Sequence, residues 1–107
     1  LKPGEEYEGV WHVEGMSHEH IIASAIYYYS SSPDLKDEGL AFRVENSYGS
    51  DWGPQGQTNW MQNTPLGAIR TNQGRVVMFS NRYQHKVTLL ENKGTDVATR
   101  KILCFFI

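Results

Sequence analysis

Hydrophobic and polar residues alternate over short runs along most of this chain, and polar segments separate the runs. The runs cover residues 10–14, 21–30, 40–44, 66–70, 75–79, 87–90 and 100–107. Turn-forming residues lie between several of them, as in the stretches 72–74 (Asn-Gln-Gly) and 92–94 (Asn-Lys-Gly). Short runs bounded by such turns are typical of strands. The pattern therefore predicts an all-β fold.

The run 21–29 also fits helical spacing, with Ser17 as a possible N-cap. Its isoleucines and its three consecutive tyrosines lose rotamer freedom in a helix and fit a pleated surface better. We therefore predict a strand here. Alternation along this strand places four residues on one face: Ile22, Ser24, Ile26 and Tyr28.

The stretch 45–65 differs from the rest of the chain. It is rich in Gly, Asn, Gln and Ser, has no hydrophobic period, and carries Trp52 and Trp60. We predict a long loop inserted into the domain, because loops of this length in compact domains are usually functional or disordered. The chain as a whole, 107 residues and 12.2 kDa, has the size of one domain (residues 1–107).

Charge and cysteine content exclude several function classes. Ten Lys and Arg against twelve Asp and Glu give a net charge of -2, which offers no electrostatic footprint for nucleic acid. No apolar run approaches the ~20 residues of a membrane span. The single cysteine, Cys104, rules out an intramolecular disulfide, and its apolar neighbours predict a buried, inert thiol. We expect neither nucleic acid nor membrane as a partner.

The final run has two apolar faces. Ile102, Cys104 and Phe106 follow Arg100 on one face, and Leu103, Phe105 and Ile107 follow Lys101 on the other. A sheet that is apolar on both sides requires a cover on each. Many short strands with Gly-rich turns indicate a sandwich or barrel, and jelly-roll and cupin-like barrels belong to that set. We expect a barrel interior on one side and flanking parts of a longer parent chain, such as helices, on the other.

The chemistry-bearing residues that remain after motif searching are few. Dinucleotide, P-loop and nucleophile-elbow motifs are missing, and His18-Glu19-His20 fails the H-E-x-x-H pattern because Ile22 stands where the second His is needed. In His12-Val13-Glu14, residues i and i+2 of an extended segment point to one side. With His85 from a later strand they would form a set of two His and one carboxylate, which suits non-haem Fe(II) oxygenases.

Arg100 begins the last strand and, held in an apolar barrel, would need an anionic partner. A bidentate carboxylate is the natural one, so a dicarboxylate co-substrate could chelate the metal at one end and bind Arg100 at the other. Arg100 and Lys101 could also be ordinary edge charges that discourage aggregation.

The order of these residues resembles the iron- and 2-oxoglutarate-dependent oxygenases of the prolyl-hydroxylase-like branch. The matching features are an H-x-E segment, an apolar strand ending in tyrosines, G-R-V-V-M-F, His85 and Arg100. More narrowly, segments such as W-H-V-E-G and L-A-F-R resemble an uncharacterised, largely fungal family of unknown function, over nearly the whole chain. The resemblance implies a double-stranded β-helix core, His12, Glu14 and His85 as Fe(II) ligands, and Arg100 and Tyr28 as contacts of the 2-oxoglutarate distal carboxylate.

Two other functions fit the same residues. One is a jelly-roll binding module without catalysis, with Trp52, Trp60 and the tyrosines 27–29 as an aromatic platform. The other is a Zn or Mn cupin that uses no 2-oxoglutarate, with His18 or His20 joining His12. The prime substrate is not indicated by the sequence under any of these hypotheses.

Overall fold

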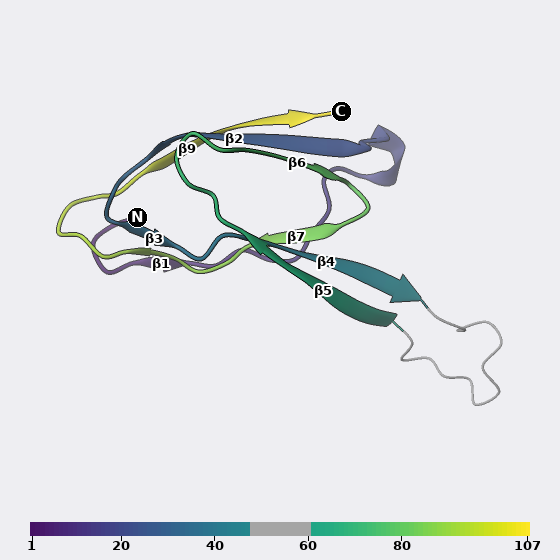
Figure 1. Ribbon diagram of the computed structural model, residues 1–107, viewed down its shortest axis with the longest axis horizontal. Coiled ribbons are helices and arrows are strands. Elements are labelled where there is room, and N and C mark those ends of the chain that lie inside the picture. Colours follow the sequence, from purple (N-terminus) through teal and green to yellow (C-terminus); the bar gives the residue numbers. More distant parts are fainter. Residues whose placement is uncertain (48–60) are drawn as a thin grey trace.

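The computed structural model describes residues 1–47 and 61–107 and confirms the all-β prediction (Figure 1). One turn of 3-10 helix, η1 (Ser17–Glu19), interrupts the strands near the N-terminus. The strands are β1 (Glu6–Tyr7), β2 (Ala23–Ser31), β3 (Leu35–Asp37), β4 (Leu40–Ser47), β5 (Met61–Ile69), β6 (Val76–Ser80), β7 (Gln84–Val87), β8 (Leu90–Asn92) and β9 (Arg100–Phe106).

The strands pair antiparallel in three sheets, with the orders β6-β2-β9, β5-β4-β7 and β1-β8-β3. The β5-β4-β7 and β1-β8-β3 sheets continue into each other, because one short link joins β3 to β4 and another joins β7 to β8. Hydrogen bonds across those links, from Glu38 N–H to the Leu89 carbonyl and from Thr88 N–H to the Gly39 carbonyl, keep the pairing nearly unbroken. The small sheets β5-β4-β7 and β1-β8-β3 thus form one bent layer.

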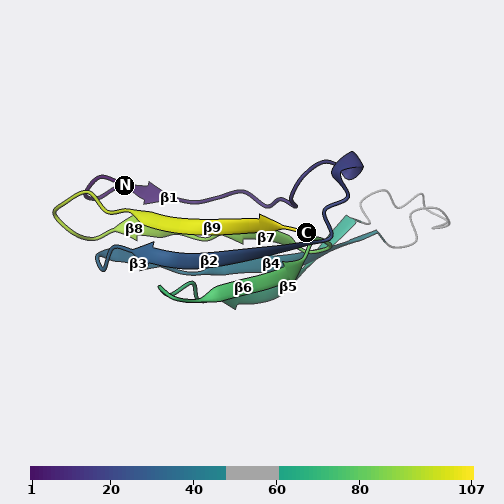
Figure 2. The same cartoon turned by 90° about the horizontal axis from the view of Figure 1, so that it is seen from above.

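The hydrophobic core lies between this bent layer and the β6-β2-β9 sheet, which is seen edge-on in Figure 1 and face-on in Figure 2. Along β6, buried residues alternate with exposed ones, as the period of a strand requires. Ile26 and Tyr28 of β2 are buried as the sequence predicts, whereas Ile22, before β2 begins, is exposed. The buried core cluster consists of Ile26, Tyr28, Leu40, Phe42, Val77 and Phe79.

The prediction of a strand over 10–14 is wrong. His12 forms only an isolated bridge with His85, and the chain leaves the sheet at Glu14. The physical reason lies in the hydrogen bonds of Glu14: its N–H donates to Asn81 Oδ1, and its carbonyl accepts from Asn81 Nδ2. A side chain thus satisfies the backbone groups that a neighbouring strand would otherwise pair with.

The prediction of a loop over 45–65 is wrong at both of its ends. β4 continues to Ser47 and β5 begins at Met61, with Glu45 opposite Asn63 in the register. Backbone pairing does not depend on a hydrophobic side-chain period, which is why the polar composition misled the prediction. Residues 48–60, with Trp52 and Trp60, lie outside the described residues.

The predicted strand 87–90 is also corrected. β7 ends at Val87 and β8 starts at Leu90, so His85 lies within β7 rather than before a strand. Thr88 between them turns its backbone N–H and its hydroxyl to the Gly39 carbonyl. No helix in the described part of the chain has the length and apolar character that a membrane span requires.

Candidate metal centre

The structure brings His12, Glu14 and His85 together. One ligand atom from each of these side chains lies within 4.8 Å of the other two. Both imidazole Nε2 atoms approach the same carboxylate oxygen, Glu14 Oε1, at 3.3 Å from His12 and 3.0 Å from His85. Two nitrogens and a carboxylate oxygen that converge from one side form the donor set of a facial metal site.

Glu14 is positioned by a residue that the sequence analysis missed. Asn81, in the turn after β6, holds the backbone of Glu14 through both its amide atoms, with distances of 2.8 and 2.9 Å. Its Nδ2 also donates to the Ile21 carbonyl at 2.9 Å. Asn81 therefore fixes where the segment after His12 leaves the sheet. The only sequence signal was an Asn in the short polar turn between two strands, which is more often a turn residue.

His12 and His85 are placed by backbone pairing. The His12 N–H donates to the His85 carbonyl at 3.1 Å, and the His85 N–H donates to the His12 carbonyl at 3.0 Å. The two rings lie with centroids 4.2 Å apart. His12 Nδ1 lies 2.8 Å from the Val10 carbonyl, an acceptor only. Nδ1 must therefore carry the proton, which leaves the Nε2 lone pair of neutral His12 for a metal.

Burial keeps His85 neutral. Its side chain is 3% exposed, and burial lowers the pKa of its imidazole, with a further lowering by the positive charge that His12 can carry. The hydrogen bond and the negative charge of Glu14 oppose these effects and are smaller. A hydrogen bond with the backbone of Tyr83 opposes the lowering of this pKa as well, and its effect is the smallest. A neutral imidazole whose Nε2 points at Glu14 is ready to act as a ligand.

Arg100 lies away from this group, at the start of β9, and the structure gives it an anionic partner within the chain. Its Nη1 donates to Asp37 Oδ2 at 2.8 Å and to Thr71 Oγ1 at 3.1 Å. The Thr71 hydroxyl in turn donates to Asp37 Oδ2. The side chains of Arg100 and Asp37 are only 11% and 17% exposed, so this is a largely desolvated pair.

Tyr28 completes the surroundings of Arg100. The guanidinium carbon lies 5.1 Å from the centre of the Tyr28 ring, within the range of a cation–π contact. Burial, the largest influence, raises the pKa of the Tyr28 hydroxyl to about 12, although the charge of Arg100 lowers it. Tyr28 is therefore a neutral hydrogen-bond donor beside a cation.

A cavity of about 470 Å³ lies next to Arg100. Val87 and Leu90 line it from the bent layer, and Ile102 lines it from β9. Val87 is two residues after His85 on the same face of β7, so the cavity extends along the strand that carries the histidine. Arg100 lines this cavity, whereas Tyr28 lies behind the guanidinium.

Other predicted residues do not join the centre. His18, in η1, and His20, after it, are exposed and belong to no metal-binding group among the described residues. Tyr27 and Tyr29 point to the outer face of β2, with ring centroids 6.0 Å apart. Cys104 is exposed, contrary to the prediction of a buried thiol, because its strand lies at the edge of the described β6-β2-β9 sheet.

Comparisons with known proteins give a family but no activity. A family model described as "Protein of unknown function (DUF4246)" matches residues 1–107. No curated protein and no solved structure matches the chain.

Proposed function

This chain belongs to the DUF4246 family of proteins of unknown function, and we propose that it is an Fe(II)- and 2-oxoglutarate-dependent dioxygenase that hydroxylates an organic substrate. The observation that carries the proposal is the convergence of His12, Glu14 and His85, whose ligand atoms lie within 4.8 Å of one another. With Fe(II), 2-oxoglutarate and O2 bound, such a centre supplies the oxidising power to hydroxylate a C–H bond.

The chemistry of the three side chains favours iron. Two neutral imidazoles and one carboxylate on one side of an ion leave the opposite positions open for other ligands. The Val10 carbonyl holds the His12 proton on Nδ1, and burial favours the neutral form of His85. In the absence of an ion, the Nε2 atoms of His12 and His85 both face Glu14 Oε1. Neutral His12 carries its proton on Nδ1, so only His85 Nε2 can donate a hydrogen bond to this oxygen. A cation would satisfy all three groups.

The surroundings of Arg100 support a dicarboxylate co-substrate. A guanidinium can bind a carboxylate through two parallel N–H groups, and Tyr28 is a neutral donor beside it. The cavity beside Arg100 is lined by Val87, the last residue of β7 and two residues after His85. Asp37 already binds Nη1, so the co-substrate would either share the guanidinium with Asp37 or displace it.

The fold proposed with this function is a double-stranded β-helix. Successive strands change layers: β2 lies in one layer, β4 and β5 in the other, β6 in the first again, then β7 and β8 opposite, and β9 beside β2. Chains that alternate between two facing antiparallel sheets in this way form jelly rolls, of which the double-stranded β-helix is one kind.

A second candidate is a Zn or Mn protein of cupin type that uses no 2-oxoglutarate. The observation that favours it is the ion pair of Arg100 with Asp37, because a guanidinium that is already neutralised needs no second carboxylate. The sequence analysis gave this candidate His18 or His20 as a ligand beside His12, but both lie outside the group of His12, Glu14 and His85. With these three ligands, the two candidates differ in the role of Arg100.

Anaerobic titration with Fe(II) tests the metal centre. We expect one Fe(II) per chain and, on addition of 2-oxoglutarate, a metal-to-ligand charge-transfer band. His85→Ala should weaken Fe(II) binding by roughly 100-fold or more, since even groups that only orient a ligand contribute 10- to 100-fold. His18→Ala, an exposed histidine outside the cluster, is the matched control and should change nothing. Equal Fe(II) binding by folded His85→Ala would contradict the proposal.

Asp37 variants test the co-substrate. Asp37→Asn keeps a hydrogen-bond acceptor for Arg100 but removes a negative charge. Two negative charges about 4 Å apart in water repel each other by ~1 kcal/mol, so without this repulsion 2-oxoglutarate should bind at least about fivefold more tightly. Arg100→Gln should abolish the charge-transfer band at the same 2-oxoglutarate concentration without loss of Fe(II). If Fe(II) binds and Arg100→Gln has no effect on the 2-oxoglutarate titration, the cupin candidate is favoured.

A further inference from the structure

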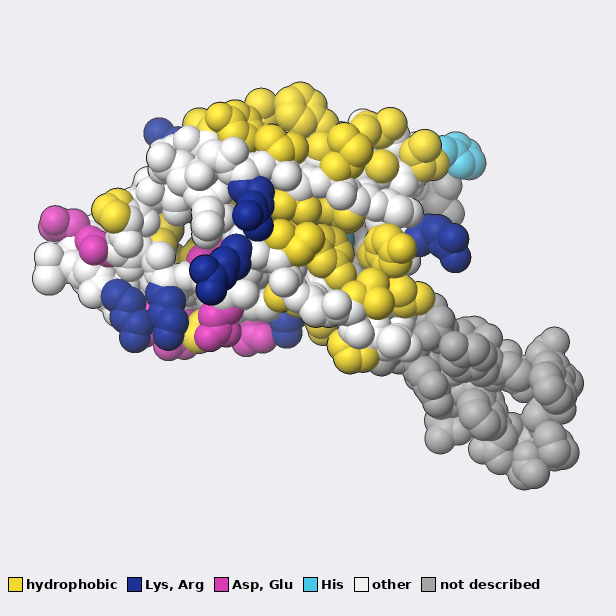
Figure 3. Space-filling view, in the orientation of Figure 1, with side chains coloured by type: hydrophobic (Ala, Val, Ile, Leu, Met, Phe, Trp, Pro, Cys, Tyr) yellow, Lys and Arg dark blue, Asp and Glu magenta, His cyan; other side chains and the backbone are white. Residues whose placement is uncertain are grey.

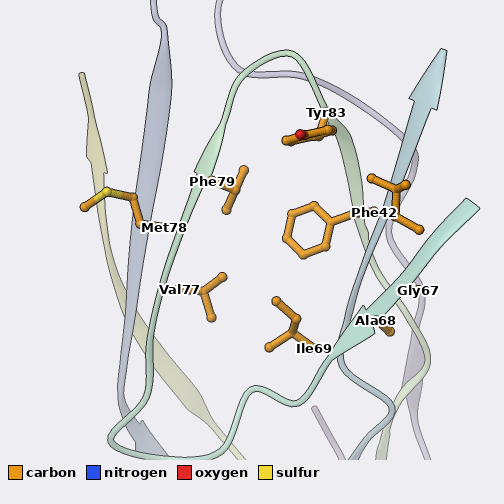
Figure 4. A pocket seen from close by; sticks show the side chains of 9 residues that line it. Phe42, Gly67, Ala68, Ile69, Val77, Met78, Phe79 and Tyr83 are labelled. Carbon is orange, nitrogen blue, oxygen red and sulfur yellow. The ribbon is translucent and has the colours of Figure 1, made fainter. Parts of the chain in front are cut away.

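A second cavity, of about 270 Å³, lies between β4 and β5 on one side and β6 on the other (Figure 4). Phe42 projects into it from β4 and Phe79 from β6, and Figure 4 shows the Tyr83 ring across one end. The cavity is separate from the one beside Arg100, since the two share no lining residue.

The wall of this cavity carries no charge. All its lining residues are apolar except Tyr83, whose hydroxyl is the single side-chain polar group there: Phe42, Leu66, Gly67, Ala68, Ile69, Val77, Met78, Phe79 and Tyr83. A charged ligand would lose its hydration without a counter-ion in such a place. A cavity of roughly 150 Å³ can hold benzene, so this one accommodates a single ring or a short branched chain.

Gly67 lines the cavity from β5. It faces Phe42 in the β4–β5 register, at a position where a bulge follows, and its φ of +112° is unfavourable for other residues. A Cβ built there would meet nothing within 4 Å. Gly67 therefore adds no side chain to this wall of the cavity.

The cavity lies directly behind the metal centre. Phe79 packs on His85 with ring centroids 4.7 Å apart, and Phe42 lies 5.0 Å from Phe79 and 6.4 Å from His85. Tyr83, at the end of the cavity, is two residues before His85 in the chain. A group bound in the cavity would thus be separated from His85 by the thickness of one aromatic ring.

We propose that this cavity anchors the organic substrate beside the metal centre, by binding a neutral aromatic ring or short branched alkyl group that carries at most one hydrogen-bonding group, held by Tyr83. This inference rests on the proposed function for its link to the metal. The binding site itself is defined by the cavity and can be tested without a metal.

Binding of toluene, p-cresol and benzoate to the chain in EDTA, followed by NMR, tests the cavity alone. We expect saturable binding of toluene and p-cresol and at least tenfold weaker binding of benzoate.

Ile69→Trp should fill the cavity and weaken toluene binding by tenfold or more, and Ile69→Phe serves in its place if the Trp variant does not fold. Val76→Trp, on the outer face of β6, is the matched control and should bind toluene as the wild type does. Lack of toluene binding, or equal binding by a folded Ile69 variant, would overturn the proposal.

Mn(II) then tests the link to the metal centre. With Mn(II) bound in place of iron, the proton resonances of cavity-bound toluene should broaden strongly, and removal of Mn(II) with EDTA should reverse this broadening while toluene stays bound. If Mn(II) binds and toluene is not broadened, the cavity is not the substrate site. If no metal binds while toluene binds as expected in EDTA, the proposed function fails and the binding cavity stands.

Discussion

At the scale of single residues, two partly buried polar pairs, Arg100 with Asp37 and His85 with Glu14, differ in how they are held. Arg100 and Asp37 compensate each other's charge and are bridged by Thr71. His85 and Glu14 form a pair in which burial favours the neutral imidazole, so the carboxylate is only partly compensated. The first pair is compensated in charge within the chain, whereas a cation bound at the second would compensate the carboxylate further.

Tyr28 connects Arg100 to the core, and its burial predicts an alkaline instability. The pKa of its hydroxyl rises from the ordinary 10.0 to about 12 in the fold. Between pH 10 and 12 the unfolded chain therefore releases a proton that the folded chain keeps, and the free energy of unfolding falls as pH rises. The loss approaches about 1.4 kcal/mol per pH unit. Urea unfolding at pH 9, 10 and 11 measures it.

Tyr28→Phe should remove this part of the pH dependence, because no hydroxyl is left to titrate. Tyr29→Phe, one residue further on the exposed face of β2, should retain it because Tyr28 is still present. Equal slopes of stability against pH in wild type and Tyr28→Phe would contradict the burial of the hydroxyl.

At the scale of elements, the link between β3 and β4 determines how the bent layer continues. Gly39 has a φ of +105°, and its carbonyl accepts two hydrogen bonds from Thr88. A Cβ on Gly39 would lie 2.5 Å from the Ile69 carbonyl oxygen, which belongs to the backbone of β5 and cannot rotate away. Only glycine therefore fits at the point where β4, β5 and the β7–β8 link meet.

Gly39→Ala should consequently lower the free energy of unfolding by more than the strain of a positive φ alone, because the added Cβ also clashes with the backbone of β5. Gly74 is the matched control, since its φ is +92° and a Cβ there would meet nothing within 4 Å. Gly74→Ala should cost about 1–2 kcal/mol, the price of a left-handed conformation. Gly39→Ala should cost at least twice as much in urea unfolding. Similar losses in the two variants would show that β5 can move aside.

The elements that the sequence predicted well are those whose side-chain pattern reflects local burial. Alternation placed β2 and its inward Tyr28 correctly, and it found most of β6 and β9. The extension of β4 and β5 depends on backbone pairing between polar segments, which leaves no hydrophobic pattern. The short strands β1, β3 and β8 pair over two or three residues, too few to show a period.

The candidate centre was predictable in its ligands but not in its supports. His12, Glu14 and His85 were found from residue type and order, and the structure brings them together. Asp37 was missed because it lies among the charged residues 34–38, a stretch that is usually a solvated surface. Its pairing with Arg100, 63 positions away, is a tertiary contact that no local pattern reveals.

At the scale of the whole molecule, the outer face of the β6-β2-β9 sheet is apolar and exposed. The register aligns Val76, Tyr27 and Leu103 in one row across the sheet, and Met78 and Phe105 flank Ala25 in the next. All but Ala25 are 39–66% exposed. Figure 3 shows hydrophobic side chains gathered along this part of the surface. Contiguous apolar patches of this kind are uncommon on monomers.

The chain on its own should therefore associate through this face as its concentration rises. Phe105→Lys combined with Leu103→Lys places two charges on the patch and should shift sedimentation velocity profiles toward the monomer. Because both side chains are about half exposed, stability should change by only about 0.5 kcal/mol. Val97→Lys is the control, an equally apolar residue that is 66% exposed in the segment before β9 and away from the sheet. If Val97→Lys reduces association as much as the double variant does, the outer face of the β6-β2-β9 sheet is not the surface through which the chain associates.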